Sequence, residues 1–556
     1  MTAAFWANFV YVPGWTGPLE WMIIVAFVLA FAVSYGMGAN DACVSDNAIL
    51  AGDNKHSQND WGTSVGAGTV KLWQAYVLCA IFNVIGALLL GYKVTNTIRE
   101  SIVDVNVYNV YSQYNSSAHS YNTVANCSPL SNITYSENMP LEPPVDCARY
   151  TSVDFIQLQL GALAGVAVFM IVSSIMKMPV SATHAIVGAT VASSLYLRGN
   201  HGIRWAEIGG IVVSWFVSPV LAGIVASIIY IIVKFTVFYR KDPFKSALQM
   251  CPIYMTFTIA INLFACIYDG SKYLGFDKLN VWQAAGISGA IGIIVGLILN
   301  FPMRKWLTNR AIYLYNKDVA KGRVRGEPVP KLGGPAGSTV VPIGLETNGT
   351  NNNGFPTPGK LEKQVSVYDH PWHHYLYSPI HEDHKAAKVF NALQMVSASL
   401  LSFSHGANDT GNTVGPLVAI WLTYKAGYAL VPADTRDDMQ LLLGFGAFAM
   451  LIGFVTLGHR TMKLIAKEIT TDVSAPSGFA VELGTAFTVL FCAKVGIPVS
   501  STHCAVGAVL FVGMTKDTTE GVSWRVFSKV VFFWLLCFPM SAVISLGVTV
   551  LFHTFL

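Results

Sequence analysis

The sequence predicts an all-α polytopic membrane protein with about 10–12 transmembrane helices, arranged in two repeats with broken helices or re-entrant hairpins at the midplane. Three observations predict this fold class. Of the 556 residues, 53% are hydrophobic and only 12% are charged, and a soluble chain normally carries about twice that charge. Apolar runs long enough to span a membrane recur along the chain. Three short motifs also occur twice, in the same order.

Each predicted spanning helix is an apolar run of ~20 residues. Shorter apolar stretches follow Pro179 and Pro498, and we interpret them as half-helices. The long runs cover residues 20–39, 74–91, 155–177, 207–235, 250–268, 281–302, 391–405, 411–425, 440–458, 478–496 and 526–555.

Polar segments divide the chain into parts. The segment 303–390 begins with a cluster of Lys and Arg residues, which the positive-inside rule places in the cytoplasm. Its middle is rich in Gly, Pro, Asn and Thr, a composition typical of a flexible linker. We therefore predict a first repeat at 1–235, additional membrane helices at 236–302, a cytoplasmic linker loop at 303–390 and a second repeat at 391–556.

The loop 95–150 has the composition of an extracellular, glycosylated segment. It contains acceptor sequons at Asn115, Asn126 and Asn132 and few basic residues. Cys127 and Cys147 lie in the same loop. A disulfide between them would close about 20 residues and stabilise the fold by ~3 kcal/mol if unstrained. Free thiols are the alternative, and the oxidising compartment that the sequons imply favours the disulfide.

The most informative feature is the duplication of motifs. Gly-Ala-Asn-Asp at 38–41 recurs at 406–409, and each copy interrupts an apolar run. Pro-Val-Ser-x-Thr-His at 179–184 recurs at 498–503. A weaker pair is Leu-Gly-Tyr-Lys at 90–93 and Leu-Gly-His-Arg at 457–460. Matching order in both halves makes a chance resemblance improbable, although each motif alone is a weak signal.

The first motif predicts an ion site. An ionisable Asp inside a membrane costs ~2.5–3.5 kcal/mol, so Asp41 and Asp409 are expected to face a cavity or a partner. The neighbouring Asn and Gly predict a locally unwound helix. Asn40 and Asn408 can donate amide hydrogens to an oxyanion and offer a carbonyl oxygen to a hard cation.

The second motif predicts an anion site. Pro179 and Pro498 suit the first turn of a helix, and the Ser and Thr residues that follow place hydroxyls beside the unpaired amides of a helix N-terminus. An oxyanion near the two carboxylates would be repelled by ~4 kcal/mol for one charge pair at 4 Å. Cations or protons would remove that repulsion, so the pattern predicts a site in which each ion improves the binding of the other.

A packing interpretation of these residues is the alternative. Gly-Ala-Asn can kink a packed helix, and Ser and Thr often bond backbone carbonyls in membranes. For His184 and His503, a core role and a functional role are equally compatible with the sequence. Two intramembrane Asp residues at matched positions are hard to explain by packing.

These motifs resemble the inorganic phosphate transporter (PiT) family, and the resemblance covers both halves of the chain. It implies two inverted repeats with about twelve spans, and cotransport of phosphate with Na⁺ at the plasma membrane. It also implies that Na⁺ binds Asp41 and Asp409, with Glu482 as another acidic position. The phosphate contacts implied by the resemblance are Asn40, Ser181, Thr183, Asn408, Ser500, Ser501 and Thr502.

Two positions depart from the family pattern. Asn83 stands where the family has a glutamate, so this candidate cation ligand keeps an oxygen and loses the charge. The segment 44–58 interrupts a pattern that would otherwise run from Cys43 directly into Asn59. Codons GTAAGT for Val44-Ser45 and CAG for Gln58 would resemble the two ends of an intron. We therefore hypothesise that these 15 residues are a retained intron.

The sequence thus favours a Na⁺-coupled phosphate symporter over an enzyme, because no nucleophile, base and orienting group can be placed together. The alternatives are a proton-coupled or sulfate-type oxyanion permease and a non-transporting phosphate sensor of the same fold. The expected partners are phosphate, Na⁺ as the coupling ion and the lipid bilayer. A homodimer is compatible with the sequence. No cofactor is expected, and the net charge of +4 gives no reason to expect nucleic acid.

Overall fold

The computed structural model describes most of the chain. The described residues are 20–40, 72–108, 110–115, 120–125, 152–176, 178, 180–200, 202–268, 270, 274–320, 382–426, 436–457, 474–516 and 522–555.

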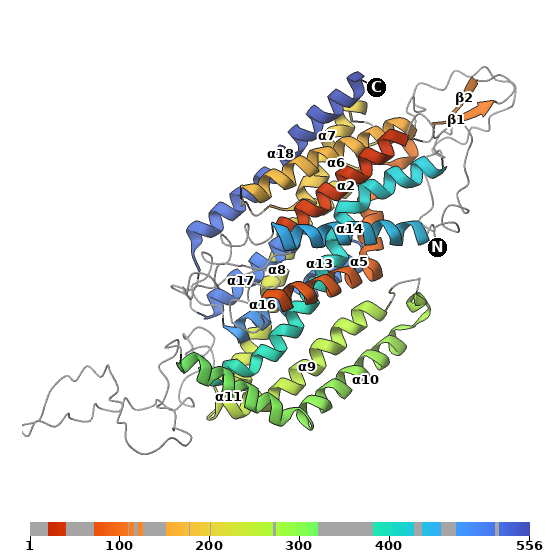
Figure 1. Cartoon of the computed structure of the whole chain (residues 1–556). Coiled ribbons are helices and arrows are strands. Elements are labelled where there is room, and N and C mark those ends of the chain that lie inside the picture. Colours follow the sequence, from red (N-terminus) through yellow and green to blue (C-terminus); the bar gives the residue numbers. More distant parts are fainter. Residues whose placement is uncertain are drawn as a thin grey trace, which may run out of the picture.

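Long helices dominate the described part of the chain and pack along one another in an elongated bundle (Figure 1). Nine of these described helices are long and apolar enough to cross a membrane, which confirms an all-α, multi-pass membrane protein. They are α2 (Glu20–Asn40), α5 (Leu72–Ser101), α6 (Ser152–Ile175), α8 (Trp205–Val233), α9 (Pro243–Ile267), α10 (Val281–Asn300), α14 (Arg436–Thr456), α16 (Ala475–Lys494) and α18 (Trp524–Phe555).

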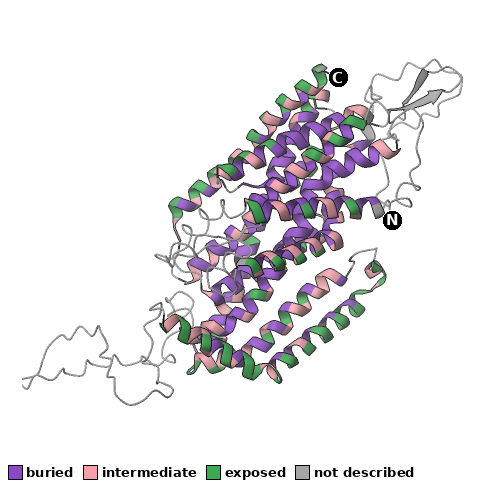
Figure 2. Ribbon diagram, viewed as in Figure 1, coloured by how far each residue is buried: buried purple, intermediate pink, exposed green. Residues whose placement is uncertain are grey.

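Burial separates central helices from peripheral ones (Figure 2). The apolar windows of α6 and α16 are 83% buried, whereas those of α10 and α18 are 22% buried. The peripheral helices expose large apolar side chains such as Phe216, Trp282 and Leu535. Lipid chains are as apolar as these residues, so such faces suit contact with the bilayer. Many polar side chains are instead buried inside the bundle.

Two short helices begin inside the bundle, as the apolar stretches after Pro179 and Pro498 predicted. Helix α7 (Ala182–Arg198) has 17 residues and α17 (Ser501–Lys516) has 16. At 1.5 Å per residue each is about 25 Å long, which is shorter than the ~30 Å apolar core of a membrane. Pro498 precedes the start of α17 instead of occupying its first turn as predicted, and Pro179 lies outside the described residues.

The two short helices enter from opposite ends of α8. Helix α7 ends at Arg198, and the short connection to Trp205 places that end close to the start of α8. Helix α17 ends close to the other end of α8, where Lys234 Nζ donates to Thr515 O at 3.0 Å. The hairpins α6–α7 and α16–α17 are therefore oppositely oriented, and the N-terminal tips of α7 and α17 meet between them.

Helix α13 (His384–Ala426) is a single helix of 43 residues. The sequence predicted separate segments at 391–405 and 411–425, with the second Gly-Ala-Asn-Asp motif unwinding the chain between them. That prediction was wrong, because the motif is helical throughout. Helix α13 packs against α5, α16 and α9 and connects the parts of the bundle.

Close helix crossings explain the glycines of the duplicated motif. A Cβ added at Gly406 would overlap the carbonyl oxygen of Asn83, and one at Gly86 would overlap that of Phe403. Helices α5 and α13 therefore touch backbone to backbone.

The first half of the chain has a matching crossing between α2 and α14. A Cβ added at Gly38 would overlap the carbonyl oxygen of Met450, and one at Gly453 would overlap that of Tyr35. The motif glycine permits the close approach of two helices in both halves.

The remaining elements lie at the edges. Helices α9 and α10 form a hairpin at one side of the bundle (Figure 1), and α11 (Arg304–Ala320), which was not predicted, is joined to α13 by Asp318 and Lys388 at 2.6 Å. Helix α5 extends to Ser101, so the predicted loop 95–150 begins later than expected. It contains an unpredicted antiparallel hairpin. The short elements are β1 (Val110–Asn115), β2 (Ser120–Ala125), η2 (Val105–Tyr108), η3 (Lys234–Phe238) and η5 (Phe276–Lys278).

Several predictions fall outside the described residues. These are Asp41, the sequons at Asn126 and Asn132, the Cys127–Cys147 disulfide and the interrupting segment 44–58. Asn115 is the last residue of β1.

The helix crossings predict a sharp difference between two glycine substitutions. Gly453→Ala forces a methyl group into the Tyr35 carbonyl and should destabilise the protein by about 1–3 kcal/mol through overpacking. Gly289→Ala on α10 meets nothing within 4 Å and should leave the melting temperature of the purified protein unchanged or slightly raised. Equal melting temperatures for the two variants would contradict the crossing.

Candidate functional site

The site begins with the caps of the two half-helices. Ser181 is the N-cap of α7, with extended backbone, and its hydroxyl accepts a hydrogen bond from His184 N at 3.4 Å. In the second half, Ser500 Oγ accepts from His503 N at 3.3 Å. Ser is a favoured cap because its oxygen replaces a missing helical acceptor. In both copies of the motif, the serine therefore caps the half-helix that follows the break, through the backbone N–H of the histidine three positions later.

The tips of α7 and α17 touch each other. Thr183 Oγ1 donates to Val499 O across the interface at 3.1 Å. The imidazoles of His184 and His503 stack with centroids 4.5 Å apart. The structure thus brings the two copies of the second motif together at one place.

Asn40 and Asn408 hold these tips in place. Asn40 Nδ2 donates to Met178 O at 2.9 Å, and its oxygen accepts from Val180 N at 3.2 Å. Asn408 Nδ2 donates to Val499 O at 2.7 Å. Each first-motif amide therefore ties its long helix to the break before a half-helix.

Asp409 lies at the centre of the hydrogen-bond network and is 1% exposed. Its carboxylate accepts from Ser501 Oγ at 2.5 Å, Asn408 Nδ2 at 2.8 Å and Asn412 Nδ2 at 3.3 Å. Asn412 also donates to Thr183 Oγ1 at 3.0 Å, which connects the carboxylate to the other half-helix. These charge-assisted bonds offset the cost of burying the carboxylate.

Two amide oxygens beside Asp409 are left without a hydrogen bond. Asn408 Oδ1 and Asn412 Oδ1 are buried and have no hydrogen-bond partner. Because both Nδ2 groups face acceptors, the orientation of each amide is fixed. Carboxylate and amide oxygens are the ligand types that a hard cation prefers. The chemistry of these three residues therefore fits Na⁺.

The imidazole of His405 lies between Asp409 and Asn83, the residue that stands where the family pattern has a glutamate. His405 Nε2 lies 2.9 Å from Asp409 Oδ2, one helical turn away. Its Nδ1 lies 3.1 Å from Asn83 Nδ2 on α5. Asn83 thus reaches Asp409 through the imidazole ring of His405.

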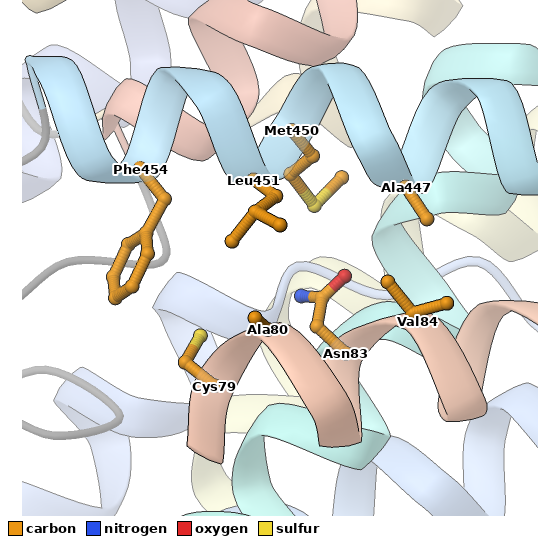
Figure 3. Close-up of a pocket in the computed structure, with 8 residues that line it drawn as sticks. All are labelled: Cys79, Ala80, Asn83, Val84, Ala447, Met450, Leu451 and Phe454. Carbon is orange, nitrogen blue, oxygen red and sulfur yellow. The ribbon is translucent and has the colours of Figure 1, made fainter. Parts of the chain in front are cut away.

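A small cavity lies beside Asn83 between α5 and α14 (Figure 3). Its other lining residues include Cys79, Met450, Leu451 and Phe454. The amide of Asn83 points toward α14, and Asn83 Oδ1 is buried without a hydrogen-bond partner. The lining offers too few oxygens to hold a cation without Asp409.

Glu482 lies apart from Asp409, in a separate polar cluster. It is fully buried on α16 and accepts from Ser397 Oγ at 2.5 Å and Gln394 Nε2 at 3.3 Å. Ser397 precedes Asp409 by 12 residues on α13 (409 − 397), which is ~18 Å along the helix. The structure therefore does not bring Glu482 and Asp409 together.

The predicted hydroxyls have different roles. Ser181 and Ser500 are caps, Thr183 bridges the tips and Ser501 donates to Asp409. Thr502 is half-buried, and its hydroxyl makes no hydrogen bond to the described residues.

Sequence reasoning missed Asn412, His405 and the tryptophans that stack on the paired histidines. Asn412 and His405 flank Asp409 at one-turn spacing on either side, a signal that was readable once α13 was known to be a continuous helix. Trp215 and Trp534 each precede a helix proline in the two halves, Pro219 and Pro539.

A family model and several relatives match the chain. The model of the phosphate transporter family (PHO4) matches residues 55–545. Sodium-dependent phosphate transporter 1 of Rattus norvegicus is 27% identical over 709 residues, covering 96% of this chain and 95% of the relative. Sodium-dependent phosphate transporter 2 of Xenopus tropicalis is 26% identical over 655 residues, covering 88% of this chain and 93% of the relative.

A solved structure has the same fold. The protein described as "The sodium-dependent phosphate transporter" superposes with a TM-score of 0.66 at 23% sequence identity, covering 96% of this chain and 100% of that chain.

Alanine substitutions at two adjacent residues at the tip of α17 should change the free energy of unfolding by different amounts. Ser501→Ala removes a donor from the buried Asp409 carboxylate and should lower the free energy of unfolding by about 1.5–3 kcal/mol. Thr502→Ala should change it by less than ~0.5 kcal/mol. Thermal unfolding of both variants without phosphate measures the difference, and equal losses would contradict the role of Ser501.

Proposed function

Because the chain belongs to the phosphate transporter family, we propose that it is a secondary active symporter that imports inorganic phosphate with Na⁺ across the plasma membrane. The similar proteins that are named as sodium-dependent phosphate transporters support this proposal. The loop 95–150 is then extracellular and the linker 303–390 cytoplasmic.

The observation that carries the proposal is the oxygen set at Asp409, located where two half-helix tips meet. Asp409 with the unpaired oxygens of Asn408 and Asn412 binds Na⁺. Here Asn408 serves the cation, because its amide hydrogens are used by Val499 O and Asp409. By the duplication, Asp41 binds Na⁺ in the first half.

Phosphate binds at the adjacent tips of α7 and α17. The N-termini of both helices carry partial positive charge and amide donors, which suit an oxyanion. Ser181, Ser500 and Thr502 lie on these tips and supply hydroxyls. Thr183 and Ser501 lie there too, but their protons are used by Val499 O and Asp409, so they position the tips. Asn40 holds the chain break in position. Glu482 belongs to a further cation position along the pathway, and Asn83 acts on the Asp409 position through His405.

Electrostatics couples the two ions. An anion 4 Å from the Asp409 carboxylate would be repelled by ~4 kcal/mol at an effective dielectric of 20. Na⁺ at Asp409 cancels that repulsion and attracts the anion. By linkage, phosphate then strengthens Na⁺ binding by the same factor. Each ion therefore binds better when the other is present, and this coupling favours symport.

Proton coupling is the second candidate, and one contact favours it. His405 Nε2 lies 2.9 Å from Asp409 Oδ2, so a proton on His405 could neutralise the carboxylate in place of Na⁺.

The segment 44–58 determines which residue follows Asn40 by four positions, and so whether the first half can match the second. In the second half, Asn412 follows Asn408 by four positions. In the first half Val44 has that position relative to Asn40, and deletion of 44–58 would give it to Asn59. We propose that the form without 44–58 has the complete pair of sites.

Uptake of radiolabelled phosphate tests the function. Cells expressing the chain without 44–58 should accumulate phosphate with Na⁺ present and lose that uptake when choline replaces Na⁺. The full chain should show less uptake, because Val44 cannot supply an amide oxygen. Equal uptake by both forms would make the segment a tolerated loop. Uptake that persists in choline at low pH would favour proton coupling, and labelled sulfate identifies a sulfate permease.

Two Asp→Asn substitutions provide a matched control. Asp409→Asn removes the charge that holds Na⁺ and should reduce uptake at least about tenfold, given several kcal/mol of lost attraction. Asp318→Asn breaks the ion pair with Lys388 outside the site and should change uptake less than about twofold. Full uptake by the Asp409 variant would contradict the proposal, and no uptake by any form would favour a sensor.

A further inference from the structure

Four aromatic rings form a continuous stack where the half-helix tips meet. Trp215 on α8 stacks on His184 with centroids 3.6 Å apart and planes at 28°. Trp534 on α18 stacks on His503 at 3.6 Å and 21°. The two imidazoles complete the stack at 4.5 Å and 16°.

The same contact to serine occurs on both sides of the stack. His184 Nδ1 lies 2.6 Å from Ser181 Oγ, and His503 Nδ1 lies 2.6 Å from Ser500 Oγ. Stacking covers the faces of the imidazoles and leaves their edges free, so it fixes the plane in which each Nδ1 meets its serine. Both copies of the duplicated motif therefore keep the same Ser–His geometry.

Hydrogen-bond accounting restricts how each serine can use its proton. A serine oxygen has one hydrogen and two lone pairs. Ser181 Oγ already accepts from His184 N. If the hydroxyl donates to Nδ1, its proton is consumed within the protein. If Nδ1–H donates to Oγ, both lone pairs are used and the hydroxyl proton must be donated elsewhere. Ser500 and His503 present the same two options.

The surroundings of the imidazoles favour the second option. Both rings are at least 95% buried. Within the described part of the chain, the hydrogen bonds of the imidazole nitrogens are the two Nδ1 contacts to serine. The Nδ1–H tautomer places the ring N–H in that hydrogen bond, whereas the Nε2–H tautomer leaves the ring N–H without a partner among the described residues.

We propose that His184 and His503 are positioning residues that direct the hydroxyl protons of Ser181 and Ser500 toward a tetrahedral oxyanion at the tips, and that Trp215 and Trp534 hold the imidazoles in this orientation. The inference rests on the proposed phosphate symport and assigns donors within the same site. It explains why each cap residue is followed by a histidine three positions later. This orientation also makes the site specific for ligands that accept, and do not donate, a hydrogen bond at each of the two serine hydroxyls.

Substitutions at His184 separate positioning from packing. His184→Asn places a side-chain N–H where Nδ1 lies, and His184→Phe keeps an aromatic ring for the stack without a donor. Phosphate uptake is measured in the form of the chain that shows Na⁺-dependent uptake, normalised to protein at the cell surface. We expect the Phe variant to raise KM for phosphate about tenfold with Vmax retained, and the Asn variant to keep KM within about threefold. His553→Phe, at a ring contact with Tyr196 away from the tips, is the control and should leave KM unchanged.

A double-mutant cycle tests whether His184 acts through Ser181. Ser181→Ala should raise KM about as much as His184→Phe, and the double variant should be no worse than Ser181→Ala alone. Multiplying effects, or a Phe variant that matches the parent while Asn fails, would overturn the positioning role and leave the symport proposal intact. Loss of uptake in the unsubstituted form would overturn the symport proposal and this inference together.

Discussion

The structure depends on burying one carboxylate inside the membrane. Asp409 is 1% exposed on a long central helix, and such a group is stable only when its oxygens are satisfied. Ser501, Asn408 and Asn412 donate to it, and Asn412 also reaches Thr183 on the opposite half-helix. The network around the buried carboxylate therefore also joins the two half-helix tips, beside the Thr183–Val499 bond and the stacked histidines.

The same arrangement explains how one site can serve ions of opposite charge. The donors of Asn408 and Asn412 are used by the protein, so their oxygens remain for a cation. The half-helix tips carry the opposite polarity and suit an anion. The paired histidines contact both tips, and Trp215 and Trp534 anchor them to α8 and α18. Displacement of one tip would therefore change the contacts of the other tip.

The sequence predicted the spans and the half-helices because apolar length and proline position report them directly. It failed at Gly406, where glycine was interpreted as a break. The structure uses that glycine for backbone contact with Asn83 on α5, and sequence alone does not reveal which helix crosses there. Asp409 was predicted as the central group, whereas Asn412 and His405 were missed because their role depends on helical register. Glu482 was grouped with Asp409, although ~18 Å of helix separates Asp409 from Ser397, the serine bound to Glu482.

The central claim is that the two ions bind cooperatively at the tips around Asp409. Equilibrium binding of radioactive Na⁺ to the purified chain without 44–58, at increasing phosphate concentrations, tests it most directly. The account predicts that phosphate lowers the Kd for Na⁺, that Na⁺ lowers the Kd for phosphate by the same factor, and that Asp409→Asn abolishes both effects. A Kd for Na⁺ that is independent of phosphate would contradict it.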